Sequence, residues 1–168
     1  MKIRMLNGGH AVIAYPAGLL DIEFASQAMQ HPLIVGFLDK IEQQEIIPTV
    51  PSVPGTDLQG YYAMISARFA NPKIADTIRR LCLDGSNRQP KFIIPTLRDR
   101  IDSNSTIDGL AIVSAFWCRY CYGETESGTI IEPNDPSWSM LKERATAARD
   151  NPETVSYTHL TLPTIYSV

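Results

Sequence analysis

Apolar side chains recur at helical spacing along almost the whole chain, and this periodicity constrains the fold more than any other feature. Within residues 33–44 they occupy the i, i+3, i+4 and i+7 positions of one helix face, at Ile34, Phe37, Leu38 and Ile41. Similar patterns cover residues 58–69, 74–81, 96–101, 110–122 and 137–150. The alternation typical of strands is weak everywhere. The 168 residues therefore predict an all-α domain of about seven or eight helices.

Prolines and capping residues set the predicted limits of these helices. An extended connector is predicted by Pro48, Pro51 and Pro54. Thr56 or Asp57 can cap the helix that follows it. The pair Asn71–Pro72 predicts the start of a helix that continues to Leu81, and Asp84–Gly85 fits its C-terminal end. Residues 110–122 are apolar almost all round, which predicts the central buried helix.

Composition places the chain among globular proteins and argues against several classes of function. Hydrophobic residues make up 44% of it and charged residues 20%, which suits a domain with a core. The net charge of −3 gives no electrostatic case for a nucleic-acid partner. No apolar run approaches the roughly 20 residues that span a membrane. Three cysteines do not make a disulfide framework, so a cytoplasmic location is expected.

The segment KIRMLNGGH, residues 2–10, carries three polar side chains that can exchange protons or hydrogen bonds with a ligand, on one predicted helix. At about 100° per residue, Lys2, Asn7 and His10 lie within one arc of about 140°. Asn7 and His10 are i, i+3 neighbours that can touch one ligand. The glycine pair between them costs on the order of 1–2 kcal/mol relative to alanines, which indicates a close approach by a neighbouring helix or a ligand. Spacing alone favours simple helix–helix contact over a catalytic site.

The catalytic alternative has a defined chemistry. A lysine beside a hydroxyl can act as general base when desolvation and nearby cations keep it neutral, and this is the role open to Lys2. Asn7 and His10 can donate hydrogen bonds to an oxygen that gains negative charge. Together the three side chains could polarise an alcohol or a carbonyl in place of a metal.

A second polar cluster, RRLCLDGSNRQPKF, spans residues 79–92. Its arginines, at positions 79, 80 and 88, flank an Asp-Gly-Ser turn. A solvated helix end with a glycine stop is the simpler interpretation for most of these residues. In the functional interpretation, the guanidinium groups anchor a polyhydroxylated or anionic small molecule, because each supplies several donors in fixed geometry.

Other motifs carry less chemistry. Cys118 and Cys121 form a lone C-x-x-C in the most apolar predicted helix, without the second ligand pair that zinc requires, so core cysteines and no metal site are predicted. Ser114 has no nucleophile-elbow glycines around it, which gives hydrolase chemistry no support. No G-x-G-x-x-G or P-loop motif occurs, so this chain is expected to contribute no cofactor-binding residues.

These residues resemble a known family. The lysine, the asparagine five positions later and the histidine three after that are similar to the signature helix of the polyol-specific long-chain dehydrogenases, the mannitol dehydrogenase family. Further segments follow in the family's order: DLQGY, RFANPKIAD, RRLCLDGS and PKFIIP. The resemblance covers about residues 1–150. It is closer to the mannitol-oxidising members than to the fructuronate reductases.

The resemblance implies the first part of the helical C-terminal domain of a two-domain, zinc-independent enzyme. NAD or NADP would be bound mainly by an N-terminal Rossmann domain that is missing from this chain, so the fragment alone is expected to be inactive. The implied reaction interconverts a polyol and a ketose of the mannitol/fructose type. A fructuronate or tagaturonate reductase is the alternative within the family, and a non-catalytic all-α binding module is the alternative outside it.

The resemblance also implies roles for individual residues. Lys2 would be the general base, while Asn7 and His10 would hold the reacting oxygen. Arg80 matches a substrate-contacting arginine. Arg88 stands where the mannitol enzymes carry a substrate-contacting lysine, which leaves the sugar specificity open. An exposed face over residues 2–14 is expected where the missing domain would sit.

The C-terminal residues differ in character from the rest. The family-like domain is predicted to cover residues 1–153, and TVSYTHLTLPT, residues 154–164, resembles the translation of a transposase-based sequencing adapter. Residues 154–168 are therefore predicted to be a non-native tail. A genuine C-terminal segment is the alternative.

Overall fold

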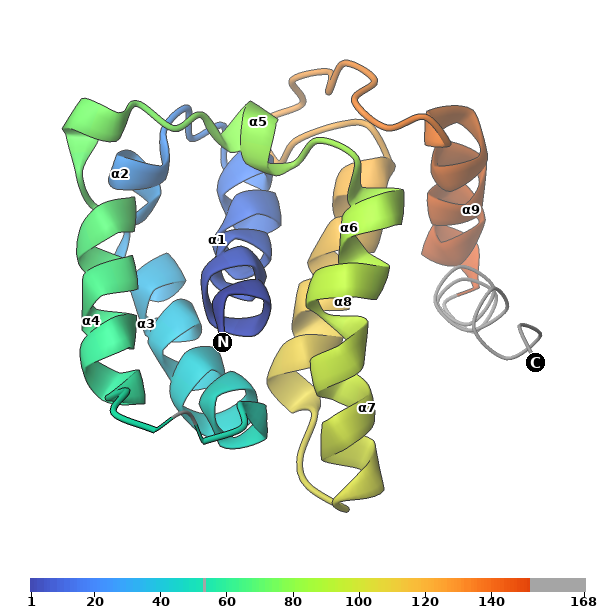
Figure 1. The fold of residues 1–168 in the computed structure, drawn as a ribbon. Coiled ribbons are helices and arrows are strands. Elements are labelled where there is room, and N and C mark those ends of the chain that lie inside the picture. Colours follow the sequence, from blue (N-terminus) through green and yellow to red (C-terminus); the bar gives the residue numbers. More distant parts are fainter. Residues whose placement is uncertain (53, 152–168) are drawn as a thin grey trace.

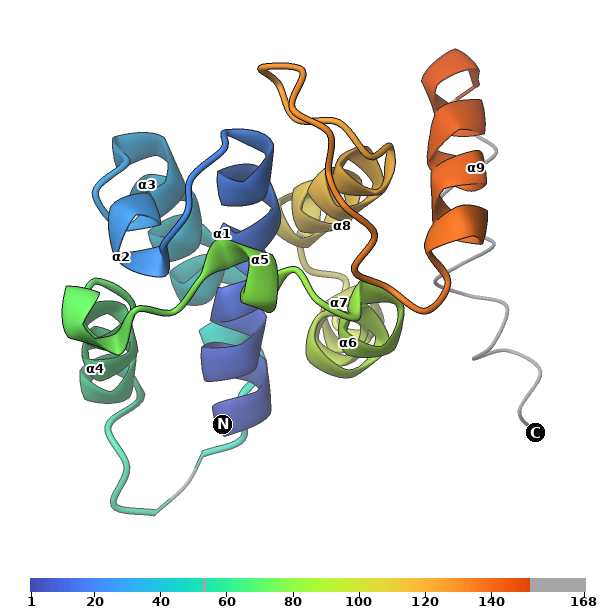
Figure 2. The same cartoon turned by 90° about the horizontal axis from the view of Figure 1, so that it is seen from above.

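The computed structural model describes residues 1–52 and 54–151, and these residues form an assembly of helices (Figures 1 and 2). They contain no strand, only isolated bridges between Phe24 and Thr77 and between Glu124 and Ile130. The all-α prediction is confirmed, whereas the predicted tail lies outside the described residues. The elements are η1 (Ile3–Asn7), α1 (Gly8–Leu19), α2 (Ala25–Ala28), α3 (Pro32–Ile41), η2 (Glu42–Ile46), η3 (Ile47–Thr49), α4 (Leu58–Phe69), η4 (Pro72–Ile74), α5 (Ile78–Leu81), α6 (Gly85–Phe92), α7 (Ile94–Asp102), α8 (Asp108–Cys121) and α9 (Trp138–Asp150).

Helix α1 is the centre of the fold. It packs against α2, α3, α5, α6 and α8, and it stands between the α3–α4 side and the α6–α8 side in both views (Figures 1 and 2). Val12, Ile13 and Ala14 are completely buried. A helix that is hydrophobic on every side is stable only in such surroundings.

The prediction that residues 110–122 form the central helix is wrong. α8 buries Leu110, Val113 and Trp117 against the core, but Ile112 on its outer side is 46% exposed. The two helices differ in side-chain size. α1 is rich in glycine and alanine, which let neighbouring helices approach closely from several directions, whereas α8 packs against α1, α3 and α9 and leaves its Ile112 side open.

The glycine pair of α1 is explained by helix packing. A Cβ on Gly9 would lie 2.9 Å from Oε1 of Glu42 and 3.2 Å from the ring of Phe69. A Cβ on Gly8 would meet Ile46 and the Phe92 carbonyl oxygen at ordinary contact distance, 3.6 Å. The close approach indicated by the sequence therefore comes from neighbouring elements of the same chain.

The segment predicted as one helix over residues 72–81 is broken into two. Asn71 caps a short 3-10 turn by accepting a hydrogen bond from the Lys73 amide at 3.0 Å. Ala75 then adopts a left-handed conformation with φ of 49°, which stops the turn. Thr77 caps α5 in turn, since its hydroxyl accepts from the Arg80 amide. The break changes the direction of the chain before α5 begins, and this direction determines the position of Arg80.

The prediction that Asp84–Gly85 ends the preceding helix is wrong, because α5 ends at Leu81 with Cys82 as its C-cap and the pair begins α6. Asp84, rather than Gly85, has the positive φ of 59°, and α6 starts immediately after it. Gly85 is required for a different reason. A Cβ there would lie 2.5 Å from Nε1 of Trp117 and 2.8 Å from the Tyr15 hydroxyl, so only glycine lets α6 approach α8 and α1 this closely.

We predict opposite effects for alanine at two glycines. Gly85→Ala should lower the free energy of unfolding by about 1–3 kcal/mol, because two aromatic side chains must move. Gly36→Ala in α3 meets nothing within 4 Å, so it should raise that energy by about 0.5–1 kcal/mol through helix propensity. Urea denaturation of both variants measures this. Equal effects would contradict the packing assigned to Gly85.

Two buried glutamates connect η2 to the rest of the core. The Glu45 carboxylate accepts hydrogen bonds from the Gly109 and Leu110 amides at 2.7 and 2.9 Å, and so caps the N-terminus of α8. Glu42 is 0% exposed, and neither of its oxygens has a hydrogen-bond partner among the described residues. Burial raises the pKa of Glu42 to about 9, so this side chain is a neutral acid at pH 7.

We predict that Glu42 makes the protein less stable as pH rises. Between its unfolded pKa near 4.5 and its folded pKa of about 9, the folded state keeps a proton that the unfolded state releases, so the free energy of unfolding falls with pH. Glu42→Gln removes this dependence, whereas Glu143→Gln on the exposed side of α9 should not. Denaturation midpoints from about pH 5 to about pH 9 test it, and a Glu42→Gln profile parallel to the wild type would contradict it.

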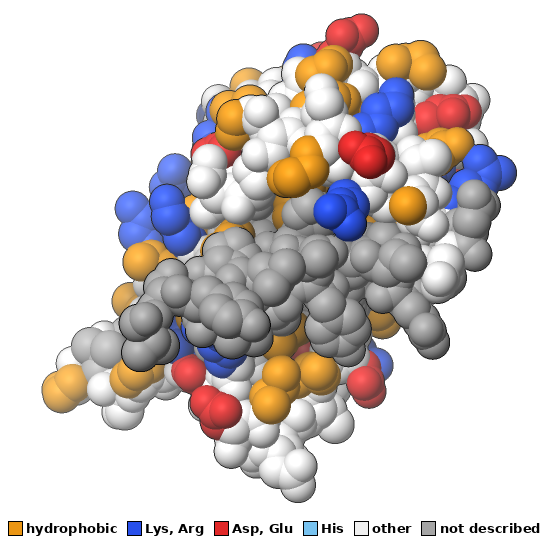
Figure 3. Space-filling model, turned by 90° about the vertical axis from the view of Figure 1, so that its right-hand side faces the viewer, with side chains coloured by type: hydrophobic (Ala, Val, Ile, Leu, Met, Phe, Trp, Pro, Cys, Tyr) orange, Lys and Arg blue, Asp and Glu red, His pale blue; other side chains and the backbone are white. Residues whose placement is uncertain are grey.

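Surface features agree with the small net charge. On the α9 side of the molecule, basic, acidic and hydrophobic side chains of the described residues are interspersed (Figure 3). Among the described helices, none combines the length and the apolar character needed to cross a membrane.

Candidate active site

The five residues to which the family resemblance assigns a role all line one pocket. It has a volume of about 300 Å³ and opens between the N-terminal part of α1, α5 and α6. Its lining is Lys2, Leu6, Asn7, His10, Ala11, Tyr15, Arg80, Leu81, Arg88 and Phe92. The residues that the sequence placed in two separate clusters therefore face a common space of the size that a small molecule occupies.

The start of the signature segment differs from the regular helix assumed above. Residues Ile3–Asn7 form a π-helical turn, in which the Gly8 amide donates to the Ile3 carbonyl. This wider turn shifts Lys2 relative to the positions calculated at 100° per residue. Asn7 and His10 keep their i, i+3 relation along α1, and all three side chains still line the pocket.

His10 is a neutral hydrogen-bonding group at pH 7. Its ring stacks on Phe69 with centroids 4.2 Å apart, and its side chain is 22% exposed. Burial lowers the pKa of His10 to about 4; Asp76 opposes this shift, and Arg80 and Arg68 add to it. A neutral imidazole has one donor and one acceptor nitrogen, so His10 can hydrogen-bond a substrate oxygen without carrying a charge.

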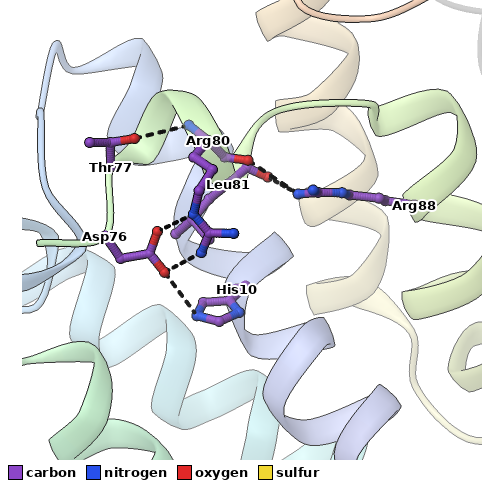
Figure 4. A network of polar contacts seen from close by, with 6 residues as sticks. All are labelled: His10, Asp76, Thr77, Arg80, Leu81 and Arg88. Carbon is purple, nitrogen blue, oxygen red and sulfur yellow. Dashed lines mark hydrogen bonds and ion pairs between the residues drawn. The ribbon is translucent and has the colours of Figure 1, made fainter. Parts of the chain in front are cut away.

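Arg80 extends from the short helix α5 and is anchored by Asp76 (Figure 4). Its Nε donates to Oδ1 of Asp76 at 2.6 Å, and its Nη2 donates to Oδ2. The bond to Asp76 raises the pKa of Arg80. Because this fork uses two of five N–H donors, three remain for a ligand.

Arg88 reaches back from α6 to the end of α5. Its Nη1 donates to the carbonyl oxygens of Arg80 and Leu81, both at 3.2 Å (Figure 4). Both carbonyls lie at the C-terminal end of α5, where helix carbonyls lack part of their intrahelical bonding; that of Arg80 also accepts from the Leu83 amide at 3.3 Å. Arg88 thus belongs to the pocket wall and also fixes the backbone that carries Arg80.

Sequence reasoning missed Asp76 and Tyr15. Asp76 precedes Arg80 by four residues, a spacing typical of helical ion pairs that could have drawn attention to it. Tyr15 lies in the pocket lining but is only 2% exposed. Nothing in the sequence distinguishes it from an ordinary core tyrosine.

The expected exposed face over residues 2–14 is wrong in its second half. Lys2 is exposed and Ile3 is 56% exposed, whereas Ala11–Ala14 belong to the core. The reason is that α1 is enclosed by other helices of this chain beyond its first turns. The exposed Lys2 and Ile3 at its N-terminal end remain available to a further domain.

Comparison with known proteins gives consistent matches. Residues 1–162 match the family model described as the mannitol dehydrogenase C-terminal domain. The mannitol 2-dehydrogenase of Cereibacter sphaeroides is 59% identical over 152 residues, which are 90% of this chain and 32% of that protein. That of Aspergillus terreus is 35% identical over 151 residues, 90% of this chain and 30% of that protein.

Solved structures show the same fold. A Pseudomonas fluorescens mannitol 2-dehydrogenase, in a ternary complex with NAD and D-mannitol, superposes with a TM-score of 0.84 at 33% identity, over 87% of this chain and 30% of that one. A substrate-free D-sorbitol dehydrogenase gives a TM-score of 0.80 at 28% identity, over 84% and 30%.

The chain belongs to the mannitol dehydrogenase family. The resemblance inferred from the signature segment is thereby confirmed, as is the assignment to the helical C-terminal domain. The chain spans about a third of the length of the curated relatives that it matches. The relatives named here are mannitol and sorbitol dehydrogenases, so the chain belongs to an oxidoreductase family.

None of the three cysteines, Cys82, Cys118 and Cys121, is among the residues that line the pocket. Cys121 is buried and Cys118 is half-buried in α8, and burial raises the pKa of both thiols. Among the described residues, no group of three or more His, Cys, Asp or Glu side chains is placed to hold a metal ion.

We predict a structural contribution from Arg88. Arg88→Ala should lower the free energy of unfolding by about 1–2 kcal/mol, since two helix-terminal carbonyls lose a charged donor. Arg79→Ala, at an exposed position of the same cluster, should change it by less than about 0.5 kcal/mol. Urea denaturation compares the two. Equal losses would contradict the capping role of Arg88.

Proposed function

We propose that this chain supplies the substrate-binding part of the active site of an NAD-dependent polyol dehydrogenase, of the kind that interconverts mannitol and fructose. One observation carries the proposal: Lys2, Asn7 and His10 line the same pocket as Arg80 and Arg88. A free-standing binding module gives no reason for this convergence. The structural neighbour that binds NAD and D-mannitol has the same fold over this region.

In the proposed reaction, Lys2 handles the proton. As a neutral amine it accepts the proton of the substrate hydroxyl, and in the reverse direction its ammonium returns that proton to the alkoxide. Lys2 is exposed in this chain. The Rossmann domain would cover it in the whole enzyme and supply the desolvation that a neutral lysine needs.

Asn7 and His10 stabilise the reacting oxygen. Asn7 offers an amide N–H, and neutral His10 offers a ring N–H, to the oxygen that carries negative charge while hydride leaves the carbinol carbon. With a base and two donors present, we propose that no zinc ion is needed. NAD supplies the hydride acceptor when it is bound, and the residues of this chain fit the polyol rather than the dinucleotide, because the chain has no phosphate-binding glycine loop.

The arginines bind the remainder of the polyol. Arg80 has three unused N–H donors for hydroxyl oxygens. Arg88 has donors beyond the Nη1 that caps α5. A linear polyol presents a row of hydroxyls, which suits donors that are held at fixed positions along one wall.

The proposal is tested in a full-length enzyme. Residues 1–152 would replace the aligned segment of the Cereibacter sphaeroides mannitol 2-dehydrogenase, to which this chain is 59% identical. We predict that the chimera oxidises mannitol with NAD, and that Lys2→Ala lowers kcat by about 10²- to 10⁴-fold, with partial recovery on addition of a primary amine.

The control is Lys40→Ala, at an exposed position in α3, which should leave kcat unchanged. The isolated 168-residue chain should show no turnover. A Lys2→Ala chimera with nearly normal kcat would remove Lys2 from the base role, and turnover by the isolated chain would overturn the expected need for the Rossmann domain.

A further inference from the structure

Asp76 lies between two polar residues of the pocket, His10 of α1 and Arg80 of α5. It lies in the turn before α5, with its side chain 14% exposed, and it is not part of the pocket lining. Figure 4 shows its carboxylate facing Arg80 on one side and His10 on the other. One half-buried carboxylate therefore faces both Arg80 and His10, the residues proposed to anchor the substrate and to bind its reacting oxygen.

The Asp76 carboxylate restricts the conformations that the Arg80 side chain can adopt. The Arg80 side chain is 57% exposed and would otherwise sample many rotamers. The fork from Nε and Nη2 onto both Asp76 oxygens fixes the plane of the guanidinium. Arg88 holds the Arg80 carbonyl as well, so Arg80 is restrained at its side chain and at its backbone.

On the His10 side, the carboxylate acts through its charge. Oδ2 of Asp76 lies 3.9 Å from Nε2 of His10, which is too far for a direct hydrogen bond. A nearby carboxylate stabilises the tautomer that carries its proton on Nε2. At 3.9 Å the carboxylate does not accept a hydrogen bond from the Nε2–H, which therefore keeps its donor free. Phe69 restricts the ring from its face.

We propose that Asp76 is a positioning residue of the dehydrogenase site: it fixes the Arg80 guanidinium against the polyol and keeps His10 in the Nε2–H tautomer. This rests on the proposed function for its catalytic consequence. The tautomer is a property of the chain itself and can be measured without turnover.

The first experiment is ¹⁵N NMR of the His10 ring in the 168-residue chain at pH 7. We expect the Nε2–H tautomer to predominate in the wild type and in Asp76→Glu. Asp76→Asn, which keeps the shape but removes the charge, should give a mixture of tautomers. Glu126→Gln, which breaks the exposed ion pair with Arg119 outside the pocket, should match the wild type. An unchanged tautomer in Asp76→Asn overturns the proposal.

The second experiment uses the chimera. Asp76→Asn should lower kcat/KM by roughly 10- to 100-fold, with KM raised and kcat lowered, and Asp76→Glu should recover part of the loss. In an Arg80→Ala background, Asp76→Asn should still lower kcat, since its effect on His10 persists. If Asp76→Asn changes KM alone, or does not lower kcat in the Arg80→Ala background, the proposed effect of Asp76 on His10 is overturned. An inactive parent chimera refutes the proposed function and leaves the NMR result to decide on Asp76.

Discussion

The burial of α1 is the constraint on which the rest of the structure depends. This helix is surrounded by α2, α3, α5, α6 and α8, and its glycines and alanines allow their close approach. Because its central residues are buried in the core, its N-terminal end is anchored to the core. Asn7 and His10 therefore project into the pocket from a core element rather than from a loop, which suits groups that must be held in place before substrate arrives.

The electrostatics of the pocket follow from this arrangement. His10 lies where burial and nearby arginines both disfavour its charged form, so it is kept as a neutral donor. The cations themselves are placed by the short helices α5 and α6, and the close approach of α6 to α1 and α8 requires glycine at position 85. The ion pair between Asp76 and Arg80 then places the Arg80 guanidinium beside the carboxylate that faces His10 on α1 (Figure 4).

Much of the secondary structure could be predicted, and the errors have local causes. Caps such as Asp57, which accepts from the Gln59 amide, are set by neighbours in sequence. The break at Ala75 was missed because alanine rarely adopts a left-handed conformation. The central position was assigned to residues 110–122 instead of α1, because the hydrophobic content of a helix does not show how closely neighbouring helices can approach it. The partner of Glu45 at the start of α8 lies 64 residues away, beyond the reach of any local pattern.

The sequence by itself determined the helical class, most helix limits and the Lys-Asn-His spacing on the first helix, because each depends on residues within a few positions of one another. The tertiary structure decided that Arg80 and Arg88 share a pocket with that helix, and that Asp76 lies between Arg80 and His10. Those contacts join segments some 70 residues apart. Their geometry depends on how the helices pack and on the turn at residues 75–77 that sets the direction of α5. Both depend on many positions at once.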